Sequence, residues 1–130
     1  MGRSRRILVV DDSVEIVEAA RAIFEARGFE VDRATNPFAG IRLAVLRPPD
    51  AIVMDLDMPG MDGLEAAAHL KRIDEVRHVP VIAFTGQPLE SITFHASRPF
   101  SRIVSKASGF GALEREIDEG AVRVLGVSLF

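Results

Sequence analysis

The chain has 130 residues, of which 48% are hydrophobic and 27% are charged, with a formal net charge of −3 and no cysteine. This length fits one domain with a sizeable core. The negative charge argues against sequence-independent binding to DNA or RNA, and the lack of cysteine excludes disulfides and thiolate metal sites. No apolar run is long enough to span a bilayer or to form a signal peptide. We therefore expect a cytoplasmic protein with no direct nucleic-acid or membrane contact and a solvated basic tail at residues 1–5.

The first half of the chain alternates strand and helix signals. Residues 7–11 follow the pattern of a parallel strand that is buried on both faces. Ser13 can cap the next helix, and Gly28 stands where a C-terminal glycine belongs. Asn36 and Pro37 predict a cap and a first-turn proline. The predicted elements are a strand over 7–11, a helix between Ser13 and Gly28, a polar edge strand over 29–35 and a helix over about 38–46.

The second half continues the same alternation. The predicted elements are a strand over 50–55, a helix from Leu64 to about Ile73, a strand over 79–84, a weak helix from Pro88 to about Ala96, a strand over 101–105 and a helix from Gly111 onward. Five strand–helix units predict a single flavodoxin-like, doubly wound α/β domain, with a parallel five-stranded sheet of order 2-1-3-4-5. We expect this domain to cover residues 6–120, and residues 121–130 to form an apolar extension of the last helix or a dimer contact.

The polar residues of interest stand at the C-terminal ends of the predicted strands: Asp11 and Asp12, Asp55, Thr85 and Lys106. Ligands bind at this edge of an open α/β sheet. Three carboxylates in one crevice repel one another, and a hard cation such as Mg²⁺ relieves the repulsion. An aspartate can serve as a phosphoryl acceptor while a lysine and a hydroxyl contact the phosphoryl oxygens. The sequence therefore predicts Mg²⁺-dependent phosphoryl chemistry.

Four segments, Val9–Ser13, Met54–Gly63, Ala83–Gly86 and Ser105–Lys106, resemble the receiver domain of two-component response regulators, and the resemblance runs from about Arg6 to Glu119. It implies that Asp55 is the phosphate acceptor. The other roles that it implies are a direct Mg²⁺ ligand at Asp12, a water-mediated contact at Asp11, a backbone carbonyl ligand at Asp57, and phosphoryl contacts from Thr85 and Lys106.

The resemblance also implies partners. A sensor histidine kinase, a histidine phosphotransfer protein or a small phosphodonor would supply the phosphate, and a downstream protein effector would recognise the face around the fourth helix and fifth strand. Such a domain is a signalling switch, a monomer or weak dimer that catalyses only its own phosphorylation and dephosphorylation, rather than an enzyme.

Three features depart from the family pattern. Ala107 follows Lys106 where proline on a cis bond is usual, and a non-prolyl cis bond costs about 3–4 kcal/mol. We therefore expect a trans bond with Lys106 displaced, or else a strained loop. Ile103 stands where an aromatic switch residue is common, so the usual coupling to Thr85 is not available. The segment 87–99 predicts an atypical fourth helix and hence an atypical output face.

Two alternatives remain at this point. A pseudo-receiver, acting only as a protein-binding module, would lack the metal site and would show a displaced Lys106. A small phosphatase of the haloacid dehalogenase type would use Asp55 and Asp57 as a D-x-D nucleophile and acid, although that motif normally ends the first strand. For Asp57 we further expect that its charge slows attack by an anionic donor or alters hydrolysis.

Overall fold

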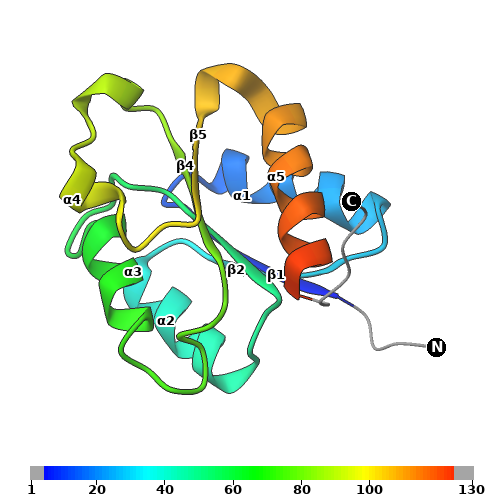
Figure 1. Cartoon of the computed structure of the whole chain (residues 1–130). Coiled ribbons are helices and arrows are strands. Elements are labelled where there is room, and N and C mark those ends of the chain that lie inside the picture. Colours follow the sequence, from blue (N-terminus) through cyan, green and yellow to red (C-terminus); the bar gives the residue numbers. More distant parts are fainter. Residues whose placement is uncertain (1–4, 125–130) are drawn as a thin grey trace.

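A computed structural model describes the backbone of residues 5–124 and the side chains of that range apart from residues 94, 95 and 119–124. The elements follow one another as β1 (Arg6–Val10), α1 (Val14–Ala26), β2 (Glu30–Ala34), α2 (Pro37–Leu46), β3 (Ala51–Met54), α3 (Gly63–Leu70), β4 (Val81–Thr85), the 3-10 turn η1 (Leu89–Ser91), α4 (Phe94–Ser97), β5 (Arg102–Ser105), the 3-10 turn η2 (Lys106–Ser108) and α5 (Gly109–Val124). Figure 1 shows the sheet between two layers of helices.

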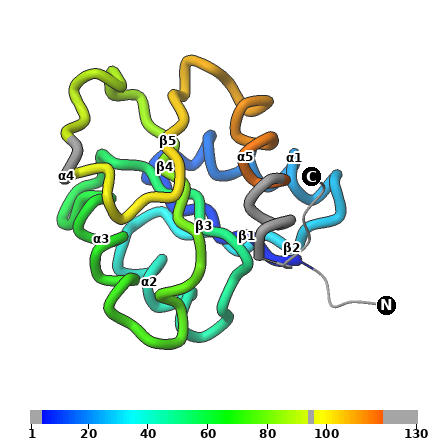
Figure 2. Tube along the Cα trace, in the orientation of Figure 1, coloured from blue at the N-terminus to red at the C-terminus, as the bar shows by residue number. Residues whose placement is uncertain are grey.

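The five strands form one parallel sheet of order β2-β1-β3-β4-β5, as predicted, with β2 at one edge. The tube in Figure 2 follows β1 and β3 through the middle of the fold. Every residue of β3 and β4 is buried, and so is every residue of β1 after Arg6. This burial explains why these strands are continuous apolar runs, since helices cover both faces of a doubly wound sheet.

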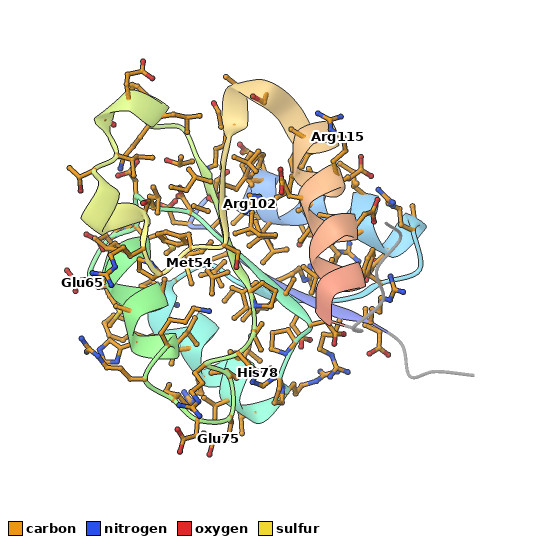
Figure 3. The ribbon with its side chains drawn as sticks, viewed as in Figure 1. Met54, Glu65, Glu75, His78, Arg102 and Arg115 are labelled. Atoms are coloured by element: carbon orange, nitrogen blue, oxygen red, sulfur yellow. The ribbon has the colours of Figure 1, made fainter. Side chains whose placement is uncertain are left out.

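Alternate strand residues point to opposite faces of the sheet and divide the core in two. On one face Ile7 and Val9 pack with Phe24 of α1 and Leu113 of α5. The opposite face carries the second cluster, in which Leu8, Val10 and Met54 join Ala44 of α2 and Leu70 of α3. Figure 3 shows Met54 in the interior, whereas the exposed Glu65 and Glu75 lie at the periphery.

The predicted helix ends are confirmed by side-chain and backbone geometry. The Ser13 hydroxyl accepts from the Ile16 N–H at 3.3 Å, and the Asn36 carboxamide accepts from the Ala39 N–H at 2.8 Å. Gly28 ends the turn after α1 with a φ of 92°, a conformation that only glycine adopts without strain. Among the described residues, no helix combines the length and apolar character needed to cross a bilayer.

The predicted continuous helix over 88–96 is wrong. The segment forms η1 and then the four-residue α4, and Ile92 between them is extended, with φ −92° and ψ 117°. Ile92 packs against the core cluster on the α2–α3 face, and the Thr93 hydroxyl accepts from the Ala96 N–H to start α4. The partly buried Ile92 therefore lies in an extended stretch that separates η1 from α4.

Two other boundaries differ from the prediction. Helix α3 ends at Leu70 rather than near Ile73, because the chain then turns back and the Lys71 ammonium donates to the carbonyls of Arg77 and Val79. Helix α5 begins at Gly109, earlier than predicted, and runs to Val124. Residues 1–4 and 125–130 lie outside the described residues, so the predicted basic tail and apolar extension remain predictions.

Candidate functional site

The three predicted carboxylates come together at the C-terminal ends of β1 and β3. These strands pair in parallel with Val10 opposite Met54, so the residues that follow them, Asp11 and Asp55, leave the sheet side by side. One oxygen from each of Asp11, Asp12 and Asp55 lies within 4.8 Å of the others. Asp11 and Asp55 are buried, at 2% and 4% exposure, whereas Asp12 is exposed. The acidic cluster therefore has two interior members and one that faces solvent.

Asp11 is held by two different donors. Its Oδ1 accepts from the Ser13 N–H at 2.9 Å, and its Oδ2 lies 2.8 Å from the Lys106 ammonium. The first contact ties the carboxylate to the start of α1 and the second ties it to the end of β5. Asp11 therefore links two elements that are far apart in the sequence.

Asp55 lies at the centre of the cluster. The Asp55 N–H donates to the Val10 carbonyl at 2.9 Å, and its Oδ1 lies 3.4 Å from the Asp57 N–H and 3.5 Å from the Lys106 ammonium. Burial, together with the negative charge of Asp11, raises the pKa of the Asp55 carboxyl to about 6, against the attraction of Lys106. Further positive charge in the site would therefore favour the anionic form of Asp55.

The loop after Asp55 returns so closely that only glycine fits at position 63. A Cβ added to Gly63 would lie 2.0 Å from the Asp55 carbonyl oxygen, and the Gly63 N–H donates to the Leu56 carbonyl at 3.0 Å. The Asp62 carboxylate caps α3 by accepting from the Glu65 N–H at 2.8 Å. The Pro/Gly-rich motif thus fixes the backbone that carries Asp55.

Thr85 is fully buried at the end of β4. Its hydroxyl oxygen accepts from the Gln87 N–H at 3.0 Å, which leaves the hydroxyl proton free to donate elsewhere. The Gln87 side chain in turn donates to the Asp57 carboxylate at 2.6 Å. This contact joins the loops that follow β3 and β4. No local pattern in the sequence indicates this contact, because the two side chains are 30 positions apart.

Lys106 reaches the acidic cluster, so the predicted displacement is wrong. Its ammonium contacts both Asp11 and Asp55, and no peptide bond in the described part of the chain is cis. Burial works against its charge, but the hydrogen bond to Asp11 and the attraction of Asp55 outweigh burial and raise the pKa of Lys106. A trans Lys106–Ala107 bond is therefore compatible with a lysine in the site, and no non-glycine residue described adopts a positive φ.

Ile103, at the position where the family often has an aromatic residue, pairs with Ala83 and packs partly buried against the core. The nearby aromatic pair lies on the other face of the sheet, where the rings of Phe84 and Phe110 are 5.4 Å apart. A branched aliphatic side chain therefore packs against the core cluster on the α2–α3 face.

The donor set suits a hard divalent cation. Three carboxylates and one ammonium leave two negative charges unbalanced. Carboxylate oxygens are the ligands that Mg²⁺ takes in proteins, and Mg²⁺ usually keeps several waters. The exposure of Asp12 leaves one side of the cluster open to such waters. The residues present therefore fit Mg²⁺, with Asp11, Asp12 and Asp55 as the group that would hold it.

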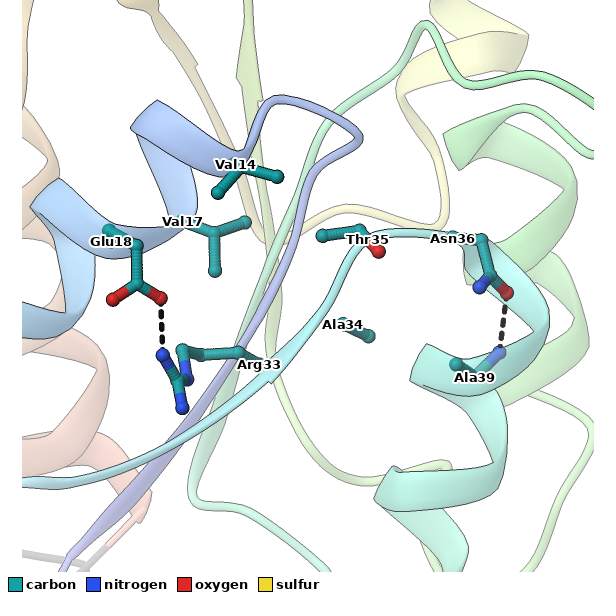
Figure 4. Close-up of a pocket in the computed structure, with 8 residues that line it drawn as sticks. All are labelled: Val14, Val17, Glu18, Arg33, Ala34, Thr35, Asn36 and Ala39. Atoms are coloured by element: carbon teal, nitrogen blue, oxygen red, sulfur yellow. Dashed lines mark hydrogen bonds and ion pairs between the residues drawn. The ribbon is translucent and has the colours of Figure 1, made fainter.

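A separate open cavity of about 330 Å³ lies between α1 and the start of α2 (Figure 4). Its lining includes Val14, Thr35 and Ala39, and an ion pair between Glu18 and Arg33 crosses one side. The hydrogen bond from Arg33 lowers the pKa of Glu18. None of the acidic cluster, Thr85 or Lys106 lines this cavity.

Comparison with known proteins agrees with this geometry. Residues 7–118 match the family described as the response regulator receiver domain. The polar-differentiation response regulator DivK of Brucella anthropi is 38% identical over 81 residues, which cover 62% of this chain and 66% of that protein. The chain is thus aligned with about two thirds of the length of that relative.

Solved structures give the same result. The response regulator TrrA of Thermotoga maritima, determined with Mg²⁺-BeF, superimposes with a TM-score of 0.81 at 26% identity, covering 89% of this chain and 98% of that one. A LuxR-family response regulator from Aurantimonas also gives 0.81 at 28% identity, with 96% and 88% covered. A receiver domain protein from Methanospirillum hungatei supports the fold, with a TM-score of 0.86 at 23% identity, 95% of this chain and 98% of that one being covered.

Proposed function

The chain belongs to the response regulator receiver domains, the phosphoacceptor signalling modules of two-component systems, and from this premise we propose that Asp55 is the residue that accepts the phosphoryl group. The observation that carries the proposal is the position of Asp55, buried at the end of β3 within reach of two further carboxylates and Lys106. Its carboxylate oxygen attacks phosphorus, a new O–P bond forms, and the bond from phosphorus to the donor's leaving group breaks. Attack by water on the acyl phosphate later returns the carboxylate and inorganic phosphate.

The remaining residues would share the charge that arrives with the phosphoryl group. Bound Mg²⁺ would neutralise phosphoryl oxygens and carboxylates together. Lys106 supplies a point charge, and its present contacts with Asp11 and Asp55 put its ammonium beside the atom that reacts. The Thr85 hydroxyl, which accepts from Gln87, can donate its proton to another oxygen. We assign the metal-binding role to Asp11, Asp12, Asp55 and the backbone carbonyl of Asp57.

We propose that the phosphate comes from a histidine kinase, a histidine phosphotransfer protein or a small phosphodonor in the cytoplasm. A phosphoryl group adds about −1.5 to −2 charges, enough to bias the loops that meet at Asp55. The loop after β4 is connected to Asp55 through Gln87 and Asp57. A downstream protein partner would therefore recognise the face formed by this loop, α4 and β5. The domain would catalyse only its own phosphorylation and dephosphorylation.

The pseudo-receiver alternative is not favoured, because its expected sign, a displaced Lys106, is absent. The phosphatase alternative is not favoured either, since Asp55 follows the third strand and the whole fold matches receiver domains.

The test is the intact mass of the protein after incubation with acetyl phosphate, with Mg²⁺ or with a chelator. We expect the wild type to gain one phosphoryl group only with Mg²⁺. Asp55→Asn should gain none, whereas Asp57→Asn, changed two residues away on the same loop, should still gain one. Equal phosphorylation of wild type and Asp55→Asn would refute the assignment of Asp55.

A further inference from the structure

The connection between β5 and α5 is the three-residue turn η2, which begins with Lys106 and lies between Ser105 and Gly109. In Figure 1 it is the orange segment that leaves β5 and enters α5. Ser105 ends β5 opposite Thr85, so its backbone is held by the sheet. Gly109 closes the turn with a φ of 80°, and its N–H donates to the Lys106 carbonyl. The backbone is thus fixed before and after Lys106.

A side chain completes this turn. The Ser105 hydroxyl oxygen accepts from the Ala107 N–H at 3.1 Å. Ala107 has an N–H to donate because it is not a proline, and the peptide bond between Lys106 and Ala107 is trans. The contact spans Lys106, since it joins the residue before it to the residue after it. The Ser105 hydroxyl therefore restricts the backbone dihedral angles at Lys106 itself.

The direction of the Lys106 side chain depends on that backbone. Its ammonium lies 2.8 Å from Asp11 Oδ2 and 3.5 Å from Asp55 Oδ1, and its side chain is 23% exposed. A lysine side chain is flexible, but its reach begins at the Cα–Cβ bond, whose direction is set by the backbone at Lys106. Displacement of a reacting or charge-stabilising group by about 1 Å can cost two orders of magnitude in rate.

We propose that Ser105 is a positioning residue for Lys106, acting through its hydrogen bond to the Ala107 N–H. The proposal rests on the function proposed above, in which Lys106 contacts the phosphoryl group. Ser105 itself touches no reacting atom. It helps to hold the trans turn in the conformation in which the lysine contacts Asp11 and Asp55.

The first experiment measures the rate of phosphorylation by acetyl phosphate over a range of donor concentrations. Ser105→Ala should lower the maximal rate about tenfold, and Ser105→Thr, which keeps a hydroxyl, should restore it to within about twofold. Ser108→Ala is the matched control, because Ser108 is an exposed serine of the same turn. A wild-type rate in Ser105→Ala would overturn the proposal.

A double-mutant cycle separates positioning from a general effect on stability. Proline has no N–H, so in an Ala107→Pro background the Ser105 hydroxyl has no donor at position 107 from which to accept a hydrogen bond. Ser105→Ala should then change the rate by less than about twofold, against about tenfold in the native background. An equal loss in both backgrounds would show that Ser105 acts by another route and would overturn the proposal.

The final readout does not depend on phosphorylation. The chain has two lysines, Lys71 and Lys106, so brief acetylation of metal-free protein followed by peptide mapping reports Lys106 against Lys71 as an internal reference. Release of Lys106 from Asp11 should raise its relative reactivity about fivefold in Ser105→Ala and leave it unchanged in Ser108→Ala. Unchanged Lys106 reactivity in Ser105→Ala would overturn the proposal. If Lys106 reactivity changes as expected but neither the wild type nor any variant is phosphorylated, the proposed function alone would be refuted.

Discussion

The two halves of the site are built differently. The acidic half, which consists of Asp11, Asp12 and Asp55 with the loop to Gly63, follows strands that are buried in the middle of the sheet. The Thr85–Lys106 half follows β4 and β5, which form one side of the sheet. It consists of Thr85, the segment 86–101, Ser105 and η2. Backbone packing holds the acidic half, as the approach of Gly63 to Asp55 illustrates. Hydrogen bonds of partly exposed side chains hold the other half: Gln87 donates to Asp57, and the Ser105 hydroxyl accepts from the Ala107 N–H.

This difference makes the acidic half rigid and allows the Thr85–Lys106 half to change conformation. Buried backbone contacts cannot change without disturbing the core, whereas hydrogen bonds near the surface open at little cost. The segment after Thr85 contains only a 3-10 turn and a four-residue helix. We therefore expect substitutions in the acidic half to affect folding and substitutions in the Thr85–Lys106 half to affect mainly the rate of phosphoryl transfer.

The largest expected effect is that of Gly63→Ala. The added methyl group would lie 2.0 Å from the Asp55 carbonyl oxygen, so the loop must move. We expect a loss of at least about 3 kcal/mol in the free energy of unfolding, measured with denaturant. Gly86→Ala is the control from the other half, because nothing lies within 4 Å of its added Cβ, and it should change stability by less than about 0.5 kcal/mol. Equal losses would remove the contrast between the halves.

Lys106→Met tests the other half directly. It keeps the length of the side chain but removes the charge that contacts Asp11 and Asp55. The rate of phosphorylation should fall about 100-fold, while Mg²⁺ should bind more tightly because a competing cation is gone. Arg102→Met on the same strand, which removes a cation paired with Glu116 instead, should leave the rate unchanged. A Lys106→Met protein with the wild-type rate would assign charge stabilisation to another group.

The next prediction concerns stability and pH in the metal-free protein. Burial and Asp11 raise the pKa of Asp55 from 3.8 to about 6, so the folded state binds this proton more tightly than the unfolded state does. Protonation of Asp55 therefore stabilises the folded state. This stabilisation is fully present below pH 4 and is lost as pH rises through about 6.

Asp55→Asn removes this dependence and should therefore stabilise the chelated protein by about 2 kcal/mol at pH 7.5, and by about a third as much at pH 4.5. Denaturant unfolding at both pH values measures the effect, with Asp74→Asn, at an exposed position, as control. If the difference in stability between wild type and Asp55→Asn is the same at both pH values, the prediction is contradicted.

The smallest effect concerns the contact between the halves. Asp57→Asn keeps an oxygen for Gln87 but removes a negative charge near Asp55. Phosphorylation by anionic acetyl phosphate should rise about twofold, with a smaller rise at high salt. Gln87→Leu breaks the hydrogen bond and leaves the charge, which separates the two contributions. The idea fails if Asp57→Asn changes neither phosphorylation nor hydrolysis.

The acidic half could be predicted from the sequence because each of its determinants is local. An apolar run followed directly by Asp11 or by Asp55 defines both the strand and its end, and parallel pairing then brings the two residues together. Helix caps at Ser13 and Asn36 are equally local signals. The alternation of strands and helices indicated a doubly wound sheet, and the flavodoxin-like form of that sheet supplied the order of the strands.

The other half could not be predicted fully because tertiary contacts decide it. The partly buried Ile92 packs against the core in an extended conformation, within a segment whose local pattern favours one helix. The expected displacement of Lys106 was inferred from Ala107 alone, whereas the Ser105 hydroxyl and the positive φ of Gly109 provide another way to hold the turn. A serine before a lysine is too common to signal such a role by itself.

The most direct test of Asp55 as the phosphoryl acceptor is to locate the acyl phosphate in the chain. Phosphorylated wild-type protein is reduced with borohydride, which converts an aspartyl phosphate to homoserine, and the product is digested and mapped by mass spectrometry. We expect homoserine at position 55 alone, dependent on Mg²⁺ and on acetyl phosphate. Homoserine at Asp11, Asp12 or Asp57, or a stable phosphate on another residue type, would contradict it.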